Sequence, residues 1–197
     1  MKKELIYFSI LVAAVISLFY DKQIVMAVTQ NRISSLEGIA SWLTSPLTVI
    51  VIFLMMTTMF LLEEKKRKLI IPLWVSVSLS TVFTLVLKFL IQRIRPFEAL
   101  NLPLIQGVDY SFHFWDYSFP SLHTSIVFSL IPILFKDFPK LKWFWLALAL
   151  LISFSRIYIG VHYLSDVLAG CLIGLLIGNG IIFLEKRGVF QWKRKKN

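Results

Sequence analysis

Six stretches of apolar residues, separated by short polar segments, dominate the chain. They run over residues 5–20, 39–62, 69–91, 122–135, 143–159 and 167–183. A helix that crosses a bilayer needs about 20 apolar residues, and about 17–25 are tolerated. The second and third stretches meet this requirement, whereas the fourth is short and contains Pro132. We count it as a span because the topology needs it, and we expect an all-α, polytopic membrane bundle of six transmembrane helices.

The composition supports this interpretation. Hydrophobic residues make up 57% of the 197 residues and charged residues only 16%, whereas soluble domains are roughly 45–50% apolar and about 25% charged. There is no repeat, low-complexity segment or Gly/Ser linker, so we expect one domain over residues 1–197. The single cysteine, Cys171, cannot form an intrachain disulfide, and we expect it to pack in the glycine-rich last stretch.

The basic residues orient the predicted bundle. The net charge is +10, but most basic residues adjoin apolar runs, so we expect contact with membrane lipids and no nucleic-acid partner. Six crossings put fifteen basic residues on one side and six on the other. The positive-inside rule makes the first side, with both termini, cytoplasmic. Cleavage of the first stretch as a signal peptide is an alternative, but no clear small-x-small site follows Tyr20.

Three basic residues on the outer side lie at or near the ends of apolar stretches: Lys88, Arg95 and Arg156. Ionisable groups at such depths are costly and suggest function, although long side chains can also snorkel to the interface. Lys88 and Arg95 are seven residues apart, so we expect both on one face of a helix that ends at Arg95, before Pro96. Two cations on one face favour an anion between them. We expect Arg93, which lies off this face, to be an interface anchor.

Two further segments carry candidate catalytic groups. Pro120 and Ser121 favour a helix start just before His123, and free backbone N–H groups at such a start favour an anion; Ser121 could alternatively be only an N-cap. Farther along the chain, Gly160 allows a turn, and His162 and Asp166 are four residues apart. If that stretch is helical, the two share a face and can hydrogen-bond.

A carboxylate on one ring N–H would fix the tautomer of His162 and leave the other nitrogen as a nucleophile or base. Three fixed cations, a hydroxyl and helix-start amides make a phosphate cradle, and two histidines supply a nucleophile and a proton donor. No carboxylate cluster suits Mg²⁺ and no Cys/His set suits Zn²⁺, so we expect neither a metal nor a cofactor. The pattern predicts metal-independent phosphoryl transfer at the outer face of a membrane.

These residues resemble a known family. Lys88-x6-Arg95-Pro96, Pro120-Ser121-Leu122-His123 and Ser155-Arg156-x5-His162-x3-Asp166 are similar in order and spacing to the three motifs of the type 2 phosphatidic acid phosphatase and haloperoxidase superfamily. The motif region covers residues 88–166, and the six-span layout resembles the integral-membrane lipid phosphatases. The resemblance implies that His162 attacks phosphorus and forms a phosphohistidine, that Asp166 holds His162, and that His123 protonates the leaving oxygen. The residues implied to bind the phosphate oxygens are Lys88, Arg95, Ser121, Leu122 through its backbone, and Arg156.

Leu122 departs from the family pattern, which usually has glycine there. A Pro-Ser-Leu-His version also resembles branches that transfer phospho-head-groups, so a phosphotransferase is the alternative to a lipid phosphatase. A non-enzymatic lipid transporter is a third reading, but it would not need the pair of His162 and Asp166. In the long outer loop, the aromatic residues fit an interfacial belt, and His113 is a weaker candidate for substrate contact.

The expected protein is therefore a multi-pass protein of the cell (inner) membrane with its site on the extracytoplasmic side. Its expected substrate is a lipid phosphate or polyprenyl diphosphate. The sequence leaves open which lipid, and the oligomeric state.

Overall fold

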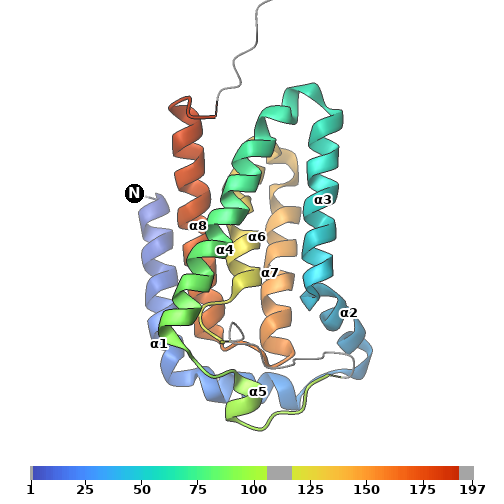
Figure 1. Ribbon diagram of the computed structural model, residues 1–197. Helices are drawn as coiled ribbons and strands as arrows, with labels where there is room; N and C mark the ends of the chain where they lie inside the picture. Colours follow the sequence, from blue (N-terminus) through green and yellow to red (C-terminus); the bar gives the residue numbers. More distant parts are fainter. Residues whose placement is uncertain (1, 106–116, 191–197) are drawn as a thin grey trace, which may run out of the picture.

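The computed structural model describes residues 2–105 and 117–190, and in this part of the chain all regular structure is helical. The all-α prediction is therefore confirmed for these residues. The elements in chain order (Figure 1) are α1 (Lys2–Gln30), α2 (Ser34–Thr44), α3 (Pro46–Leu62), the 3₁₀ turn η1 (Glu64–Leu69), α4 (Ile70–Ile91), α5 (Pro96–Ala99), α6 (Leu122–Asp137), the 3₁₀ turn η2 (Pro139–Leu141), α7 (Lys142–Tyr158) and α8 (Leu164–Lys186).

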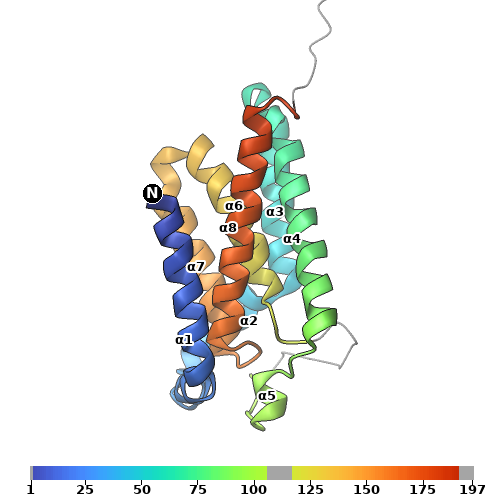
Figure 2. The same cartoon turned by 90° about the vertical axis from the view of Figure 1, so that its left-hand side faces the viewer.

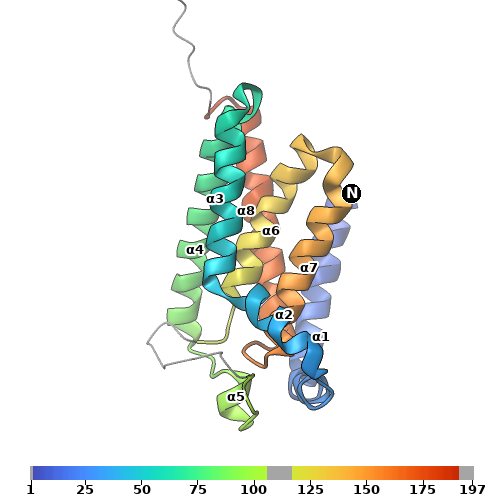
Figure 3. The same cartoon turned by 90° about the vertical axis from the view of Figure 1, so that its right-hand side faces the viewer.

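The long helices pack as a bundle around a central pair, α6 and α8. Figure 2 shows α8 between α1 and α4, and Figure 3 shows α6 between α4 and α7. The start of α1, the α3–α4 turn, the α6–α7 turn and the end of α8 lie toward one end of the bundle, and α5 with the α1–α2 and α7–α8 connections lies at the other (Figure 1). The six apolar stretches therefore alternate in direction as the sequence predicted.

The number of spans differs from the prediction. Four helices are long and apolar enough to cross a membrane, and a fifth span results if α2 and α3 count as one. These two helices meet at 54° because Ser45 adopts an extended conformation before Pro46. The predicted span over residues 39–62 is therefore broken at this bend. α6 has 16 residues, fewer than a typical span, so a multi-pass membrane bundle is confirmed but six spans are not.

α6 and α8 approach closely because glycines line their contact. Gly170, Gly174 and Gly178 are spaced four apart on the α8 face toward α6, and all three are buried. A Cβ added at Gly174 would lie 2.4 Å from the carbonyl oxygen of Ser125. Small residues at helix interfaces in membranes allow such close backbone packing.

A row of hydroxyl side chains leads along α4 toward the end that carries the motifs. Ser76, Ser80 and Thr84 are fully buried and spaced four apart, and Lys88 continues the row one turn later. Ser76 Oγ donates a hydrogen bond of 3.1 Å to the carbonyl oxygen of Ser129 on α6. A polar row thus runs along α4 beside the apolar packing of α4 on α6, and this row ends at a buried cation.

Candidate active site

The three motifs meet where α4 ends, α6 begins, and α7 connects to α8. Lys88 lies in the last turn of α4, Arg156 in the last turn of α7, and Asp166 in the first turn of α8. All three side chains are buried, as are Arg95 and His162. Burial of this many charged groups at one place in an apolar bundle indicates a built site, because isolated buried charges are strongly unfavourable.

Lys88 and Arg95 reach this place from two separate elements, contrary to the prediction of one helix face. α4 ends at Ile91 because Gln92 adopts a left-handed conformation (φ 50°). Arg95 is extended (φ −72°, ψ 151°), as expected before Pro96, and is the N-cap of the short helix α5.

The connection between α7 and α8 presents His162. Gly160 has φ +86°, a conformation that strongly favours glycine, and the chain turns there before α8 begins at Leu164. His162 therefore precedes the helix, so the condition under which it would share a helix face with Asp166 is not met. The two still meet: His162 Nδ1 lies 3.6 Å from Asp166 Oδ2, an ion-pair distance longer than a hydrogen bond.

Asp166 is held by several donors. Its Oδ2 accepts a 2.8 Å hydrogen bond from the backbone N–H of Tyr163 and a second, short one from Ser118 Oγ. Its Oδ1 accepts a 2.6 Å charge-assisted hydrogen bond from Arg93 Nη1. The Tyr163 contact is the acidic half of a capping box at the start of α8, so Asp166 both caps its helix and faces His162.

Arg93 is not a simple interface anchor, and that prediction is wrong. Its guanidinium bridges two carboxylates, because Nη2 also pairs with Asp21 Oδ2 of α1 at 2.8 Å. It stacks on the Tyr163 ring, with its Cζ 4.1 Å from the ring centroid. Sequence reasoning missed Asp21 and Ser118 altogether. A signal for Asp21 was present, since it is an acidic residue directly after the first apolar stretch.

The segment that opens α6 is tied to both neighbouring elements. Lys88 Nζ donates to the carbonyl oxygens of Tyr117, through a short bond, and Ser118, at 3.4 Å. Ser118 N donates to the Arg93 carbonyl oxygen at 2.7 Å, and Ser121 N donates to the Asp166 carbonyl oxygen at 3.0 Å. These contacts fix the start of α6 against the end of α4 and the start of α8.

Ser121 occupies the N-cap position of α6, but its side chain makes no capping hydrogen bond. Its Oγ instead accepts a hydrogen bond of 3.1 Å from Thr124 Oγ1. The interpretation of Ser121 as only an N-cap therefore does not hold for its side chain. Leu122 is the first helical residue, and the N–H groups of a first turn have no partner within their helix.

The electrostatics of the site favour a neutral His162. Burial lowers the pKa of His162 well below its usual range, and the positive charges of Lys88, Arg95 and Arg156 lower it further. The same three cations, and His162 itself, interact electrostatically with His123. Both imidazoles thus lie within reach of the cationic cluster, where an anion would offset the repulsion.

Among the residues the structure describes, no three His, Cys, Asp or Glu side chains gather to hold a metal ion. The predicted candidate His113 and the aromatic residues Tyr110, Phe112, Phe114 and Trp115 lie in residues 106–116, outside the described part of the chain.

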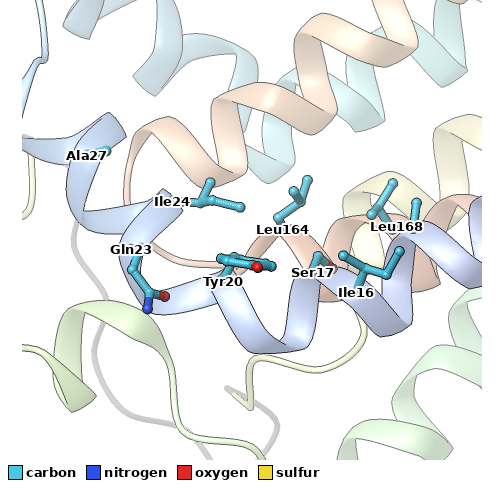
Figure 4. A pocket seen from close by; sticks show the side chains of 9 residues that line it. Ile16, Ser17, Tyr20, Gln23, Ile24, Ala27, Leu164 and Leu168 are labelled. Carbon is cyan, nitrogen blue, oxygen red and sulfur yellow. The ribbon is translucent and has the colours of Figure 1, made fainter.

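An apolar groove of about 630 Å³ lies between α1 and α8 at the same end of the bundle (Figure 4). Tyr20 and Leu164 line it, whereas their chain neighbours Asp21 and Ser165 are buried and bonded to each other. The contact of α1 with α8 is thus apolar on the groove side and polar on the side toward Arg93.

Comparisons with known proteins agree with this geometry. Residues 69–188 match the model of the PAP2 superfamily. The undecaprenyl-diphosphatase of Sulfolobus acidocaldarius is 27% identical over 180 residues, which cover 86% of this chain and 80% of that protein. The Bacillus licheniformis protein named bacitracin transport permease protein BcrC is 48% identical over 64 residues, but the match spans only 32% of each protein.

The crystal structure of a transmembrane PAP2-type phosphatidylglycerolphosphate phosphatase from Bacillus subtilis has the same fold. The TM-score is 0.71 at 21% identity, over 96% of this chain and 98% of that one. The matched region, residues 69–188, contains all three motifs and the helices that carry them. The chain therefore belongs to the PAP2 superfamily, as its motifs predicted.

Proposed function

We propose that this protein is a membrane phosphatase that hydrolyses the terminal phosphate of a lipid phosphate or polyprenyl diphosphate. The observation that carries the proposal is a buried His162 that faces Asp166 at 3.6 Å, beside three buried cations in a bundle of apolar helices. Two relatives named above are phosphatases of such substrates by name. The whole chain acts as one domain.

In the first step, Lys88, Arg95 and Arg156 bind the phosphoryl oxygens together with the first N–H groups of α6. These cations stabilise the charge that develops in the transition state. Asp166 lies on the Nδ1 side of His162, so Nε2 attacks phosphorus. A P–N bond forms as the P–O bond to the lipid breaks, and His123 donates a proton to the leaving oxygen.

In the second step, water attacks the phosphohistidine. His123, which has lost its proton, accepts one from this water, the P–N bond breaks, and inorganic phosphate leaves. His162 is regenerated as a neutral imidazole, so the net reaction consumes one water and releases phosphate and a lipid alcohol or monophosphate. Because the Lys and Arg side chains neutralise the phosphoryl group, the reaction needs no metal ion.

The site faces the extracytoplasmic side of a cell membrane, with α6 as a sixth span. The connections at the opposite end carry Lys65–Lys68 and the basic residues of the α6–α7 turn. The positive-inside rule assigns that end to the cytoplasm, together with both termini.

The decisive experiment assays purified protein with EDTA against phosphatidate, phosphatidylglycerol phosphate, undecaprenyl diphosphate and lipid A phosphates. Phosphate release should persist in EDTA and be inhibited by vanadate, which can adopt a five-coordinate geometry with His162 as axial ligand. Rapid quenching with labelled substrate should trap phosphate on the wild-type protein but not on His162→Ala. Unchanged turnover in His162→Ala, or a strict requirement for Mg²⁺, would contradict the mechanism.

Leu122 favours a second candidate, a phospho-head-group transferase, because its side chain stands at the first turn of α6, where the family usually has glycine. An acceptor alcohol added to the assay distinguishes the two functions. A hydrolase forms inorganic phosphate, whereas a transferase forms a new phosphoester. Leu122→Gly should keep or raise hydrolysis if the leucine is only a tolerated variant.

A further inference from the structure

A second carboxylate stands behind the predicted catalytic one. Arg93 lies between Asp166 and Asp21, at 2.6 Å and 2.8 Å. The Asp21 side chain is 2% exposed and that of Asp166 is fully buried, whereas the Arg93 side chain is 25% exposed. The order Asp21, Arg93, Asp166, His162 therefore runs from α1 across the end of α4 to the turn before α8.

Asp21 itself is rigidly placed. Its Oδ1 accepts a hydrogen bond of 3.0 Å from the backbone N–H of Ser165, and its Oδ2 accepts a short bond from Ser165 Oγ. Ser165 Oγ also accepts a bond of 2.6 Å from Arg93 Nη1. Asp21 thus holds Arg93 directly and through Ser165, which precedes Asp166 in the chain.

Arg93 and His162 contact different carboxylate oxygens of Asp166. Arg93 takes Oδ1, which leaves Oδ2 toward His162. Without Arg93, only the bonds that Oδ2 accepts from Tyr163 N and Ser118 Oγ would hold the carboxylate, and Oδ1 would lose its charged donor, so rotation about the soft χ2 torsion would be less restricted. The carboxylate would also be a buried anion with less compensation for its lost hydration. Fixing Asp166 fixes the orientation and tautomer that His162 needs.

We propose that Asp21 and Arg93 are positioning residues of the active site, which act on His162 only through Asp166. This inference rests on the proposed function. Asp21 lies outside residues 69–188, the region that matches the family, so α1 completes a site whose motifs are all on other helices. Lysine cannot replace Arg93, because a single ammonium cannot span both carboxylates as the planar guanidinium does.

The test compares purified Arg93→Gln, Arg93→Lys and Asp21→Asn with a matched control, Arg32→Gln. Arg32 is also half-buried, but it bonds to the main-chain carbonyls of Pro103, Tyr158 and Ile159. Rates with an aryl phosphate of good leaving group keep slow variants measurable. Thermal unfolding of each variant separates loss of fold from loss of chemistry.

Both Arg93 variants should lower kcat about 10–100-fold, the size typical of residues that orient a catalytic ligand, with KM changed less than about threefold. Asp21→Asn should lower kcat by less. Adding Arg93→Gln to Asp166→Asn should cause no further loss, since residues that act as a unit are non-additive. Arg32→Gln should lower the unfolding temperature and leave kcat unchanged.

A normal kcat in Arg93→Gln, or a loss that multiplies with that of Asp166→Asn, would overturn the inference while the wild-type activity upholds the proposed function. A wild-type protein that hydrolyses nothing in the panel would overturn the proposed function, and this inference with it.

Discussion

Replacing Gly170 with alanine should push α8 away from α6 at the end that carries the candidate active site. The new Cβ would lie 2.6 Å from the Ser121 carbonyl oxygen, and ordinary contact begins at 3.4 Å, so the shortfall is 0.8 Å. The obstacle is a backbone atom, which cannot rotate away. Ser121 N is bonded to the Asp166 carbonyl oxygen at 3.0 Å, so this separation strains the contact that aligns the two helix starts.

Overpacking of this kind costs about 1–3 kcal/mol of unfolding free energy, and a displacement approaching 1 Å near reacting groups can cost about 100-fold in rate. We expect Gly170→Ala to lower the unfolding temperature and to lower kcat about 10–100-fold. The matched control is Gly180→Ala on the same helix, where a Cβ meets nothing within 4 Å. That variant should keep its activity and gain up to about 1 kcal/mol from helix propensity.

Thermal unfolding in detergent and initial rates of phosphate release, measured side by side, give the result. If Gly170→Ala matched Gly180→Ala in both measurements, the close packing of α6 and α8 would not position the site.

The remaining predictions concern the histidines, pH and topology. A substrate with a good leaving group should partly rescue His123→Ala, which lacks the leaving-group acid, but not His162→Ala; equal, unrescued losses would refute these roles. Because the pKa of His162 is lowered from its usual value of 6.5, this side chain should stay neutral at pH values somewhat below 6.5. The fall of kcat/KM on the acid side should therefore begin below pH 6.5, and a fall that begins above pH 6.5 would contradict this prediction. In the unfolded chain His162 takes up a proton near pH 6.5, whereas in the folded chain it does not. The free energy of unfolding should therefore fall as the pH drops through 6.5. In intact cells, Glu98→Cys should react with an impermeant thiol reagent and Lys68→Cys only after permeabilisation; the reverse would invert the proposed orientation.

Local patterns predicted the helices well, because the apolar stretches correspond to the long helices. The structure brings His162 and Asp166 to the connection between α7 and α8, and Arg156 lies in the last turn of α7. The end of α4 was misplaced by four residues because Pro96 restricts only Arg95, whereas the helix ends at Ile91, before a left-handed conformation at Gln92 that glutamine does not signal.

The role of Arg93 could not be predicted for a different reason. Its partners Asp21 and Asp166 are 72 and 73 residues away in the chain. No periodicity links residues at such separations, so only the packing of α1 against α8 shows that the three charges meet. Seven-residue spacing likewise placed Lys88 and Arg95 at one site but could not show that they reach it from two elements.

Arg32 determines how α7 ends. Its guanidinium donates to the carbonyl oxygens of Tyr158 and Ile159 at 2.8 Å and 2.7 Å, where the negative end of the α7 macrodipole lies. A cation at this position commonly comes from the last turn of the same helix, which in α7 carries Arg156. Because an arginine from the α1–α2 connection donates to these carbonyls, the end of α7 is neutralised from outside the helix and does not depend on a basic residue of its own last turn.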